Sequence, residues 1–254
     1  MSSRILYNNL WDGGTLTDSS EASGYSGTNT QQRWPTRVWR STGITSEWIK
    51  VNLGSAKAIQ ALVLHDHNLT AGATVTLQGN ATDSWGAPSY NQALTWAVAG
   101  DGPYTTFCYF PASTQTYQWW RLTIADTGNT AGYLSVGRIF LGPYTGLTRT
   151  YKSRKSSYED PSVVETSIGG QKTSFQLTRY RTWQYDLPNI ASDKSTLLGI
   201  LKVVGTSVPW FFCEDSTYPS VMTFYVQYAG AMSFSYNADD YQVEAASMKL
   251  EEMR

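Results

Sequence analysis

The side chains that could do chemistry are few in this sequence. Its two histidines lie in one short segment, His65-Asp66-His67. Positions two apart on a strand face the same side, so His65 and His67 could share a metal ion with a carboxylate. The same segment is where an apolar strand passes into a loop, which favours ordinary hydrogen-bonded histidines. We therefore predict no metal ligand here, and no metal site or cofactor elsewhere.

Sequence motifs for nucleophilic catalysis and phosphate binding are missing. No G-x-S-x-G elbow occurs, and the stretch 24–27 (Gly-Tyr-Ser-Gly) has the wrong spacing. No phosphate-binding glycine loop is present either. The adjacent carboxylates Asp239-Asp240 and Glu251-Glu252 would point to opposite faces of a strand, which makes them poor acid–base partners. The sequence thus predicts that the protein is not an enzyme.

Tryptophan is the most informative residue type, since the chain contains ten. An exposed indole face suits stacking on a sugar ring or burial at a protein interface. The same rings could instead cover the ends of a β-sandwich as a minor core, and this alternative stays open. The candidate glycan or partner contacts are four tryptophans in polar, loop-like surroundings, namely Trp11, Trp34, Trp39 and Trp85.

Composition and charge exclude several classes of protein. Charged residues make up 15% of the chain, hydrophobic residues 41%, and the net charge is −1. These values exclude intrinsic disorder, and they give no positive excess for binding a nucleic-acid backbone. The basic cluster of Arg149, Lys152, Arg154 and Lys155 is closely followed by acidic residues, which indicates a solvated linker. No apolar run approaches the roughly 18 residues of a membrane span, so we expect no membrane insertion.

The two cysteines, Cys108 and Cys213, are 105 residues apart, each in an apolar and aromatic stretch. This spacing is neither a disulfide framework nor a zinc-binding pattern. We expect buried free thiols that belong to different domains.

Short strands dominate the first part of the chain. Residues 13–30 are polar and glycine-rich, which is typical of loops. The expected strands, with turn residues between them, are 48–53, ending at the turn signal Gly54, then 58–65, 73–79, 105–110, 117–124 and 133–141. Several short strands with this punctuation favour a β-sandwich. Strand patterning stops near 142–146, so we predict domains at 1–145 and 146–254.

The second domain is also expected to be rich in β-structure. One segment predicts a helix, because Leu197, Leu198, Leu201 and Val204 recur near helical spacing. Ser192 would cap its start and Gly205 would end it. Strands are expected within 171–187 and at 208–213, 221–228, 232–236 and 241–248.

The first domain resembles the discoidin family of galactose-binding-like jelly-roll sandwiches. The residues that carry the resemblance are 39–42 (WRST), 46–54 (SEWIKVNLG), 59–69, 120–124 (WRLTI) and 132–139 (GYLSVGRI). The resemblance implies an all-β sandwich whose end loops hold a ligand, often a glycan or a lipid. Some members of the family bind calcium in an early loop, and the calcium question stays open for this sequence.

The two domains together resemble minor and distal tail proteins of long-tailed bacteriophages. The residues that carry this resemblance are 123–129, 132–133 and 137–142, then 179–181 (RYR), 208–212 (VPWFF) and 241–244 (YQVE). The resemblance implies a virion component at the tail tip, assembled in the host cytoplasm. Its second domain would form a homo-oligomeric ring with contacts to tube, hub and fibre proteins. The candidate interface residues are Arg179, Arg181, Trp183 and Trp210.

Two main functional hypotheses follow. The leading one is a structural tail protein that could also contact host polysaccharide. The alternative is a free carbohydrate-binding module or lectin that stacks sugars on Trp34, Trp39 or Trp85. A degradative role that depends on His65 or His67 is the weakest.

Overall fold

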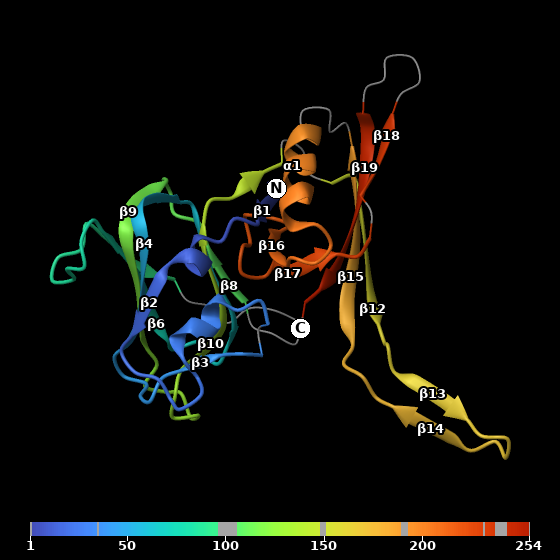
Figure 1. Cartoon of the computed structure of the whole chain (residues 1–254), viewed down its shortest axis with the longest axis horizontal. Helices are drawn as coiled ribbons and strands as arrows, with labels where there is room; N and C mark the ends of the chain where they lie inside the picture. The colour runs from blue at the N-terminus through green and yellow to red at the C-terminus, as the bar shows by residue number, and fades with distance from the viewer. Residues whose placement is uncertain are drawn as a thin grey trace. The chain divides into compact units, whose positions relative to one another are not determined.

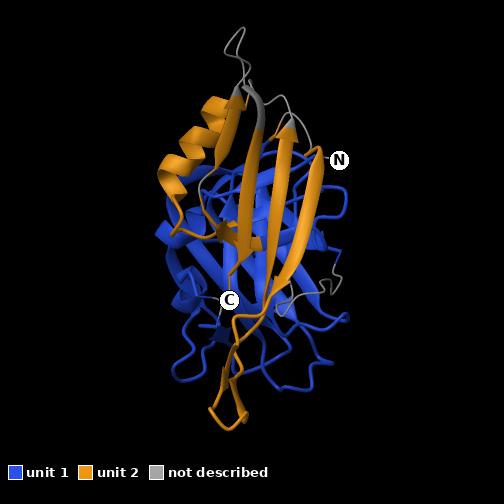
Figure 2. Ribbon diagram, turned by 90° about the vertical axis from the view of Figure 1, so that its right-hand side faces the viewer, with its two compact units in different colours: residues 1–146, 211–224 blue, residues 147–210, 225–254 orange. Residues whose placement is uncertain are grey.

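The chain forms two compact units in a computed structural model (Figures 1 and 2). Unit 1 comprises residues 1–146 and 211–224, and unit 2 comprises 147–210 and 225–254. The expected boundary after residue 145 lies one residue from this division, but residues 211–224 return to unit 1. The structure describes residues 2–34, 36–95, 106–147, 151–188, 193–230, 232–236 and 243–253.

Unit 1 is built around two antiparallel sheets that face each other (Figure 1). The five-stranded sheet has the order β2 (Thr15–Asp18), β4 (Glu47–Ile59), β9 (Gln115–Ala125), β6 (Thr74–Asn80) and β7 (Tyr90–Leu94). The four-stranded sheet has the order β3 (Trp39–Arg40), β10 (Ser135–Gly142), β5 (Ala61–His67) and β8 (Thr106–Tyr109). This is the two-layer sandwich that the sequence predicted.

Alternating side chains of the two sheets build the core of unit 1. Ile49 and Val51 of β4 are fully buried, and so are Leu62 and Leu64 of β5. Burial of a large aliphatic side chain contributes roughly 1.5–3 kcal/mol each, so this core dominates the stability of the unit.

Strand β4 is longer than the sequence predicted. The chain does not turn back at Gly54, where φ is +74°, but continues to Ile59. The pairing register with β9 shifts between Asn52 and Lys57, which is the signature of a bulge. Glycine supplies the positive φ that the bulge needs. The expected strand 58–65 is accordingly divided at Gln60 between β4 and β5.

The polar N-terminal region is more regular than expected. It contains strand β1 (Arg4–Leu6), the 3-10 helices η1 (Leu10–Gly13) and η2 (Gly27–Gln31), and β2. The prediction of an irregular loop over 13–30 is therefore wrong for β2 and η2. Side-chain caps stabilise both short helices, because Asn9 accepts a hydrogen bond from Trp11 N and Ser26 accepts one from Thr28 N.

The segment 211–224 places the second cysteine in unit 1. Strand β16 (Trp210–Cys213) pairs with β1, which also pairs with β11 (Thr145–Gly146). The Phe211 ring lies 5.7 Å from the His65 ring of β5, edge to face. Cys108 and Cys213 are both buried and free, as predicted, but they lie in the same unit rather than in different domains.

Unit 2 has a sheet of long strands. Its strand order is β17 (Thr223–Tyr228, in unit 2 from Tyr225 onward), β19 (Val243–Glu252), β15 (Tyr180–Pro188) and β12 (Ser153–Glu159), with β18 (Ser233–Tyr236) paired to β19. β12 covers much of the expected linker, so the linker prediction is wrong over 153–159. All seven residues of β12 are exposed. A two-stranded ribbon of β13 (Val163–Thr166) and β14 (Lys172–Phe175) follows β12.

The predicted helix is present as α1 (Lys194–Val204), and it buries Leu197, Ile200 and Val204. Gly205 ends it with φ +53°. Asp193 occupies the N-cap position, whereas Ser192 lies outside the described residues. Arg149, Asp239-Asp240 and part of the expected strand at 241–248 also lie outside them. Within the described part of the chain, no helix is long and apolar enough to span a membrane.

Candidate binding site in the loops of unit 1

The register of the strands assigns the loops of unit 1 to two ends of the sandwich. β6 begins at Thr74, opposite Ala125, and ends at Asn80, opposite Trp119. The loop after β9, residues 126–134, therefore lies at the end where β6 begins. We call this the β9–β10 end. The loop 81–89, which carries Trp85, follows β6 and lies at the opposite end.

The N-terminal loops belong to the β9–β10 end. Arg40 of β3 pairs with Ser135, the first residue of β10. The backbone N–H of Ser41 donates to the Leu134 carbonyl at 3.0 Å. The Ala22 N–H donates to the Arg40 carbonyl at 2.8 Å and the Arg40 N–H donates to the Tyr25 carbonyl at 3.1 Å, so this end gathers loops that are far apart in the sequence.

The N-terminal segment before β3 lines an open hollow of about 440 Å³. We call it the Tyr25 hollow, and its lining residues are Ser23, Gly24, Tyr25, Asn29, Thr36, Arg37 and Val38. Its size is within the range of small-molecule sites. It offers one aromatic ring together with amide, hydroxyl and guanidinium groups, and this mixture suits a ligand that has both polar and apolar faces.

Local hydrogen bonds fix the shape of the Tyr25 hollow. The Tyr25 N–H donates to the Ala22 carbonyl at 2.9 Å, closing a turn in which Gly24 has φ +84°. The Asn29 side-chain amide donates to the Val38 carbonyl at 3.0 Å. This bond ties η2 to the segment that enters β3, so the two walls of the hollow are held together.

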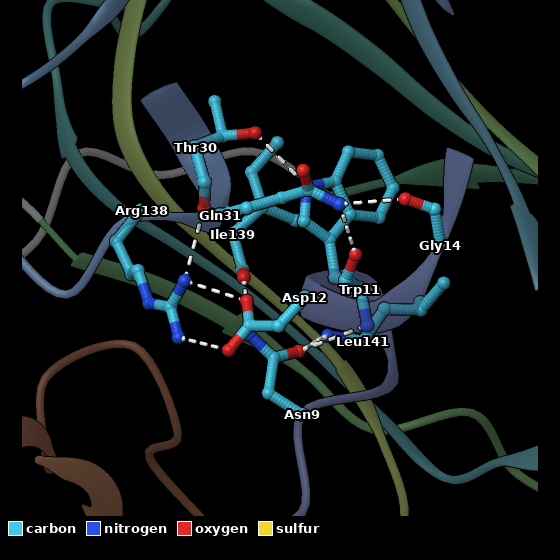
Figure 3. Close-up of polar contacts among 9 residues, drawn as sticks. All are labelled: Asn9, Trp11, Asp12, Gly14, Thr30, Gln31, Arg138, Ile139 and Leu141. Carbon is cyan, nitrogen blue, oxygen red and sulfur yellow. Dashed lines mark hydrogen bonds and ion pairs between the residues drawn. The ribbon is translucent and has the colours of Figure 1, made fainter. Parts of the chain in front are cut away.

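A partly buried ion pair holds η2 against β10. Arg138 of β10 donates one hydrogen bond to each carboxylate oxygen of Asp12, both at 2.6 Å, and a third to the Thr30 carbonyl at 3.2 Å (Figure 3). Thr30 in turn accepts a hydrogen bond from the indole N–H of Trp11. Burial raises the pKa of the Asp12 carboxyl, and the hydrogen bond and charge of Arg138 oppose this shift.

Arg40 lies between two aromatic rings beside the hollow. Its guanidinium carbon is 4.0 Å from the ring centre of Tyr25 and 4.7 Å from that of Tyr133. This stacking holds the Tyr25 ring in place through cation–π attraction. Sequence reasoning missed Tyr25, Asn29, Arg37 and Arg40. The one available signal was an aromatic residue between Gly24 and Gly27 in an otherwise polar stretch.

Among the four tryptophans predicted from sequence, Trp34 is the one with an open ring, since 57% of it is exposed. Its carbonyl accepts a hydrogen bond from Arg37 N at 3.1 Å, so it begins the turn that leads into the hollow. Trp85 is half-buried at the opposite end of the sandwich. The Arg121 guanidinium covers its ring at 4.5 Å, and its indole N–H donates to Asp83 at 2.5 Å.

The other two tryptophans do not fit the predicted contact role. Trp11 and Trp39 are 1% and 0% exposed, respectively, and both belong to the hydrophobic core. Their indole N–H groups are used internally, by Thr30 and by the Ser20 carbonyl. The structure therefore corrects the prediction for these two residues, because a buried ring has no face for a ligand.

The two histidines are buried in hydrogen-bonded positions. His65 Nδ1 is 2.8 Å from Thr106 Oγ1, and His67 Nδ1 accepts a hydrogen bond from Leu69 N at 3.3 Å. Burial lowers the pKa of His67 to about 4. Across the described residues, no group of three or more His, Cys, Asp or Glu side chains is arranged to hold a metal ion.

The candidate assembly residues of unit 2 divide into two kinds. Trp183 and Trp210 are 3% and 2% exposed, respectively. Neither ring has an open face for a partner, so the structure corrects the prediction that these two residues form interface contacts. Arg181 is mostly buried and binds Glu252 at 2.5 Å. Arg179 is exposed and binds Asp160 at 2.9 Å, and its role as an interface residue stays a prediction.

No family model and no curated protein matches the sequence. Among solved structures, the chain is similar to a variant of chitosan-binding module 1 from a chitosanase/glucanase of Paenibacillus sp. IK-5, with 25% identity and a TM-score of 0.42 over 55% of this chain and 99% of that one. It is also similar to the lectin domain of lectinolysin complexed with Lewis B antigen, with 16% identity and a TM-score of 0.42 over 53% of this chain and 95% of that one. A Streptococcus pneumoniae fucose-binding module has 10% identity and a TM-score of 0.41 over 54% of this chain and 95% of that one.

Proposed function

We propose that this protein is a non-catalytic glycan-binding protein whose site is the Tyr25 hollow with Trp34 at its margin. The observation that carries the proposal is the exposed ring of Trp34. The backbone carbonyl of Trp34 is bonded to the N–H of Arg37, which lines the hollow. A sugar has an apolar face of C–H groups and an edge of hydroxyls. An exposed indole ring can stack on the C–H face, and hydrogen-bonding side chains can bind the hydroxyl groups.

The polar side chains of the hollow are suitably placed for the hydroxyl edge. Asn29 lies in η2 and Arg37 in the segment between η2 and β3, and both line the hollow together with Ser23. Loops held on a rigid sandwich are the usual place for binding residues, because the scaffold fixes them while their sequence can vary. The hydrogen bonds of Asn29 and the stacking of Arg40 fix the walls before a ligand arrives, which lowers the entropic cost of binding.

The proposal is tested by screening the full chain against an array of bacterial and animal glycans. Binding to a defined set of sugars, lost in a Trp34→Ala variant that melts at the same temperature as the parent, is the expected result. Absence of binding to every sugar tested, or binding that is unchanged by Trp34→Ala, would overturn it.

A second candidate function is the structural role in a bacteriophage tail. The observation that favours assembly is the ribbon of β13 and β14 in unit 2, whose large apolar side chains are exposed. A tail protein that touches host polysaccharide would combine both functions. The tail location itself stays a prediction from the sequence resemblance. Immunogold electron microscopy of particles from the source culture tests it, since absence of the chain from every particle would exclude the tail role.

A further inference from the structure

The β13–β14 ribbon of unit 2 exposes an unusual amount of apolar surface. We call this segment, residues 160–179, the arm. It extends away from the rest of the unit 2 sheet (Figures 1 and 2). Its large apolar side chains have exposed fractions of 48% for Val163, 60% for Val164, 110% for Ile168, 60% for Phe175 and 50% for Leu177.

Exposed apolar side chains on a two-stranded ribbon indicate a surface that binds another protein segment. A single hairpin is marginally stable in water, because it has no second layer on which to bury its side chains. Among the described residues, every side chain of β13 and β14 is exposed, and each of the two strands pairs with the other alone. Clustered apolar surface of this kind marks sites of protein association.

The strand register places the two charged residues of β13 and β14, Glu165 and Lys172, on different faces of the ribbon. Directly paired residues of an antiparallel ribbon share a face, and successive residues alternate. Val163 pairs with Phe175 and Glu165 with Thr173, so these four form one face, which we call the acidic face. Val164 pairs with Ser174 and Thr166 with Lys172, so these four form the other face, which we call the basic face.

We propose that the arm binds the arm of a second copy of this chain, with the acidic face of one packed on the basic face of the next. Each face carries at least one apolar side chain and one charged residue. The two charges have opposite signs, so the acidic face of one copy is complementary to the basic face of another. Stacking unlike faces brings Glu165 toward Lys172 and Val163 with Phe175 toward Val164. Stacking like faces would bring together charges of the same sign.

Unlike-face stacking has a defined consequence for the assembly. Each copy then uses two different surfaces, which is a heterologous contact, and such contacts produce a closed ring or an open filament rather than a simple two-fold dimer. The inference concerns unit 2 alone. It does not depend on glycan binding by unit 1, and glycan binding could fail while this assembly holds.

Charge reversal tests the proposal with the full chain. We expect the parent protein to form oligomers at micromolar concentration, measured by sedimentation velocity. Glu165→Lys makes both faces basic, and Lys172→Glu makes both faces acidic, so each variant alone is expected to be monomeric at concentrations at which the parent associates. An equimolar mixture of the two is expected to associate again, because every acidic face then meets a basic one. The double variant E165K/K172E restores opposite charges within each copy and is also expected to associate.

The matched control is Lys202→Glu, a charge reversal at an exposed position of α1, which is expected to leave association unchanged. Circular dichroism melting of each variant verifies that unit 2 remains folded. A parent protein that is monomeric up to about 100 µM overturns the proposal. Failure of both the mixture and the double variant to associate, or association of the single variants at parental strength, also overturns it.

Discussion

Arg138 and Asp12 form a two-bond ion pair, with both N–O distances at 2.6 Å, that connects the four-stranded sheet to the first 3-10 helix of unit 1 (Figure 3). The guanidinium also bonds the carbonyl of Thr30, next to Asn29 of the Tyr25 hollow. The side chain of Arg138 is 5% exposed and that of Asp12 is 37% exposed. One buried cation therefore positions two polar loops that have no strong local preference of their own.

Removing Arg138 should destabilise unit 1. Arg138→Met leaves a carboxylate in a partly buried place without its partner, which we expect to lower the free energy of unfolding by about 2–4 kcal/mol. Urea denaturation measures this change. The double variant Arg138→Met/Asp12→Asn should recover part of the loss, because no unpaired charge is left. A double variant as unstable as the sum of the two single variants would contradict a direct interaction between the residues.

Trp34 should dominate glycan affinity if the Tyr25 hollow is the site. Trp34→Ala removes the exposed stacking face, and we expect an affinity loss of about 2 kcal/mol, or roughly 30-fold. Isothermal titration with the best sugar from the array measures the affinity. The matched control is Trp85→Ala at the opposite end of the sandwich, which should leave affinity unchanged. A larger loss for Trp85→Ala than for Trp34→Ala would move the site to the other end.

Asn29 should contribute to glycan affinity at the same site, because its side-chain amide donates a hydrogen bond to the Val38 carbonyl and so connects the two walls of the hollow. Asn29→Ala removes this bond and one polar group of the hollow, so we expect weaker glycan binding with a loss of about 1 kcal/mol in stability. Thr28→Ala, an exposed neighbour outside the lining, serves as the control in the same titration. Equal effects of the two substitutions on affinity would count against a role for Asn29.

Asp66 should make stability depend on pH. Burial raises the pKa of its carboxyl from 3.8 to about 6, so between these values the folded chain holds a proton that the unfolded chain has released. Its contribution to stability is therefore fully present below pH 4 and is lost as the pH rises through 6. Asp66→Asn should gain about 1–2 kcal/mol relative to the parent between pH 4 and pH 7, after allowance for partial exposure. Asparagine tolerates the φ of +55° at this position, so the backbone is unchanged.

His67 should act with the opposite sign over the same range. Burial lowers its pKa from 6.5 to about 4, so its contribution is present above pH 6.5 and is lost as the pH falls through 4. His67→Asn removes this titration, and its amide oxygen can still accept the bond from Leu69. Urea midpoints measured from pH 4 to pH 7 check both residues. Parallel pH profiles for the parent and either variant would contradict the corresponding shift.

The two cysteines should be protected in the native state. Burial raises the pKa of Cys213 to about 11, and burial with the neighbouring thiol raises that of Cys108 further. Because the thiolate is the reactive form, a colorimetric thiol reagent at pH 8 should react slowly with the folded chain and rapidly with both cysteines in urea. Fast reaction of either cysteine without denaturant would show that its site opens readily.

Several features of the fold were predictable because their cause is local. The alternation of Val75 and Leu77 predicts a half-buried strand, and the spacing from Leu197 to Val204 with Gly205 behind it predicts a helix that ends there. The apolar surroundings of both cysteines likewise predict buried thiols. In each case the residues that decide the structure lie within a few positions of one another.

The candidate site was less predictable, because polar loops have no hydrophobic periodicity that indicates how they pack. Trp11, Trp34 and Trp39 have similar neighbours in sequence, yet two are in the core and one is exposed. What separates them is which loops pack together, and this depends on long-range contacts such as the one between Arg138 and Asp12. Sequence reasoning named Trp34 as a candidate contact but did not name Tyr25 or Arg40, for the same reason.

The sequence by itself determined that this protein is mostly β-structure with one amphipathic helix in its second part, and that its loops are rich in aromatic side chains. The tertiary structure alone decided that residues 211–224 return to unit 1, that Trp34 keeps an open ring, and that Glu165 and Lys172 lie on opposite faces of the arm. The physical reason is that strand and helix periods are set by neighbours along the chain. Strand partners, loop packing and the exposure of a face are set by residues that are distant in the chain.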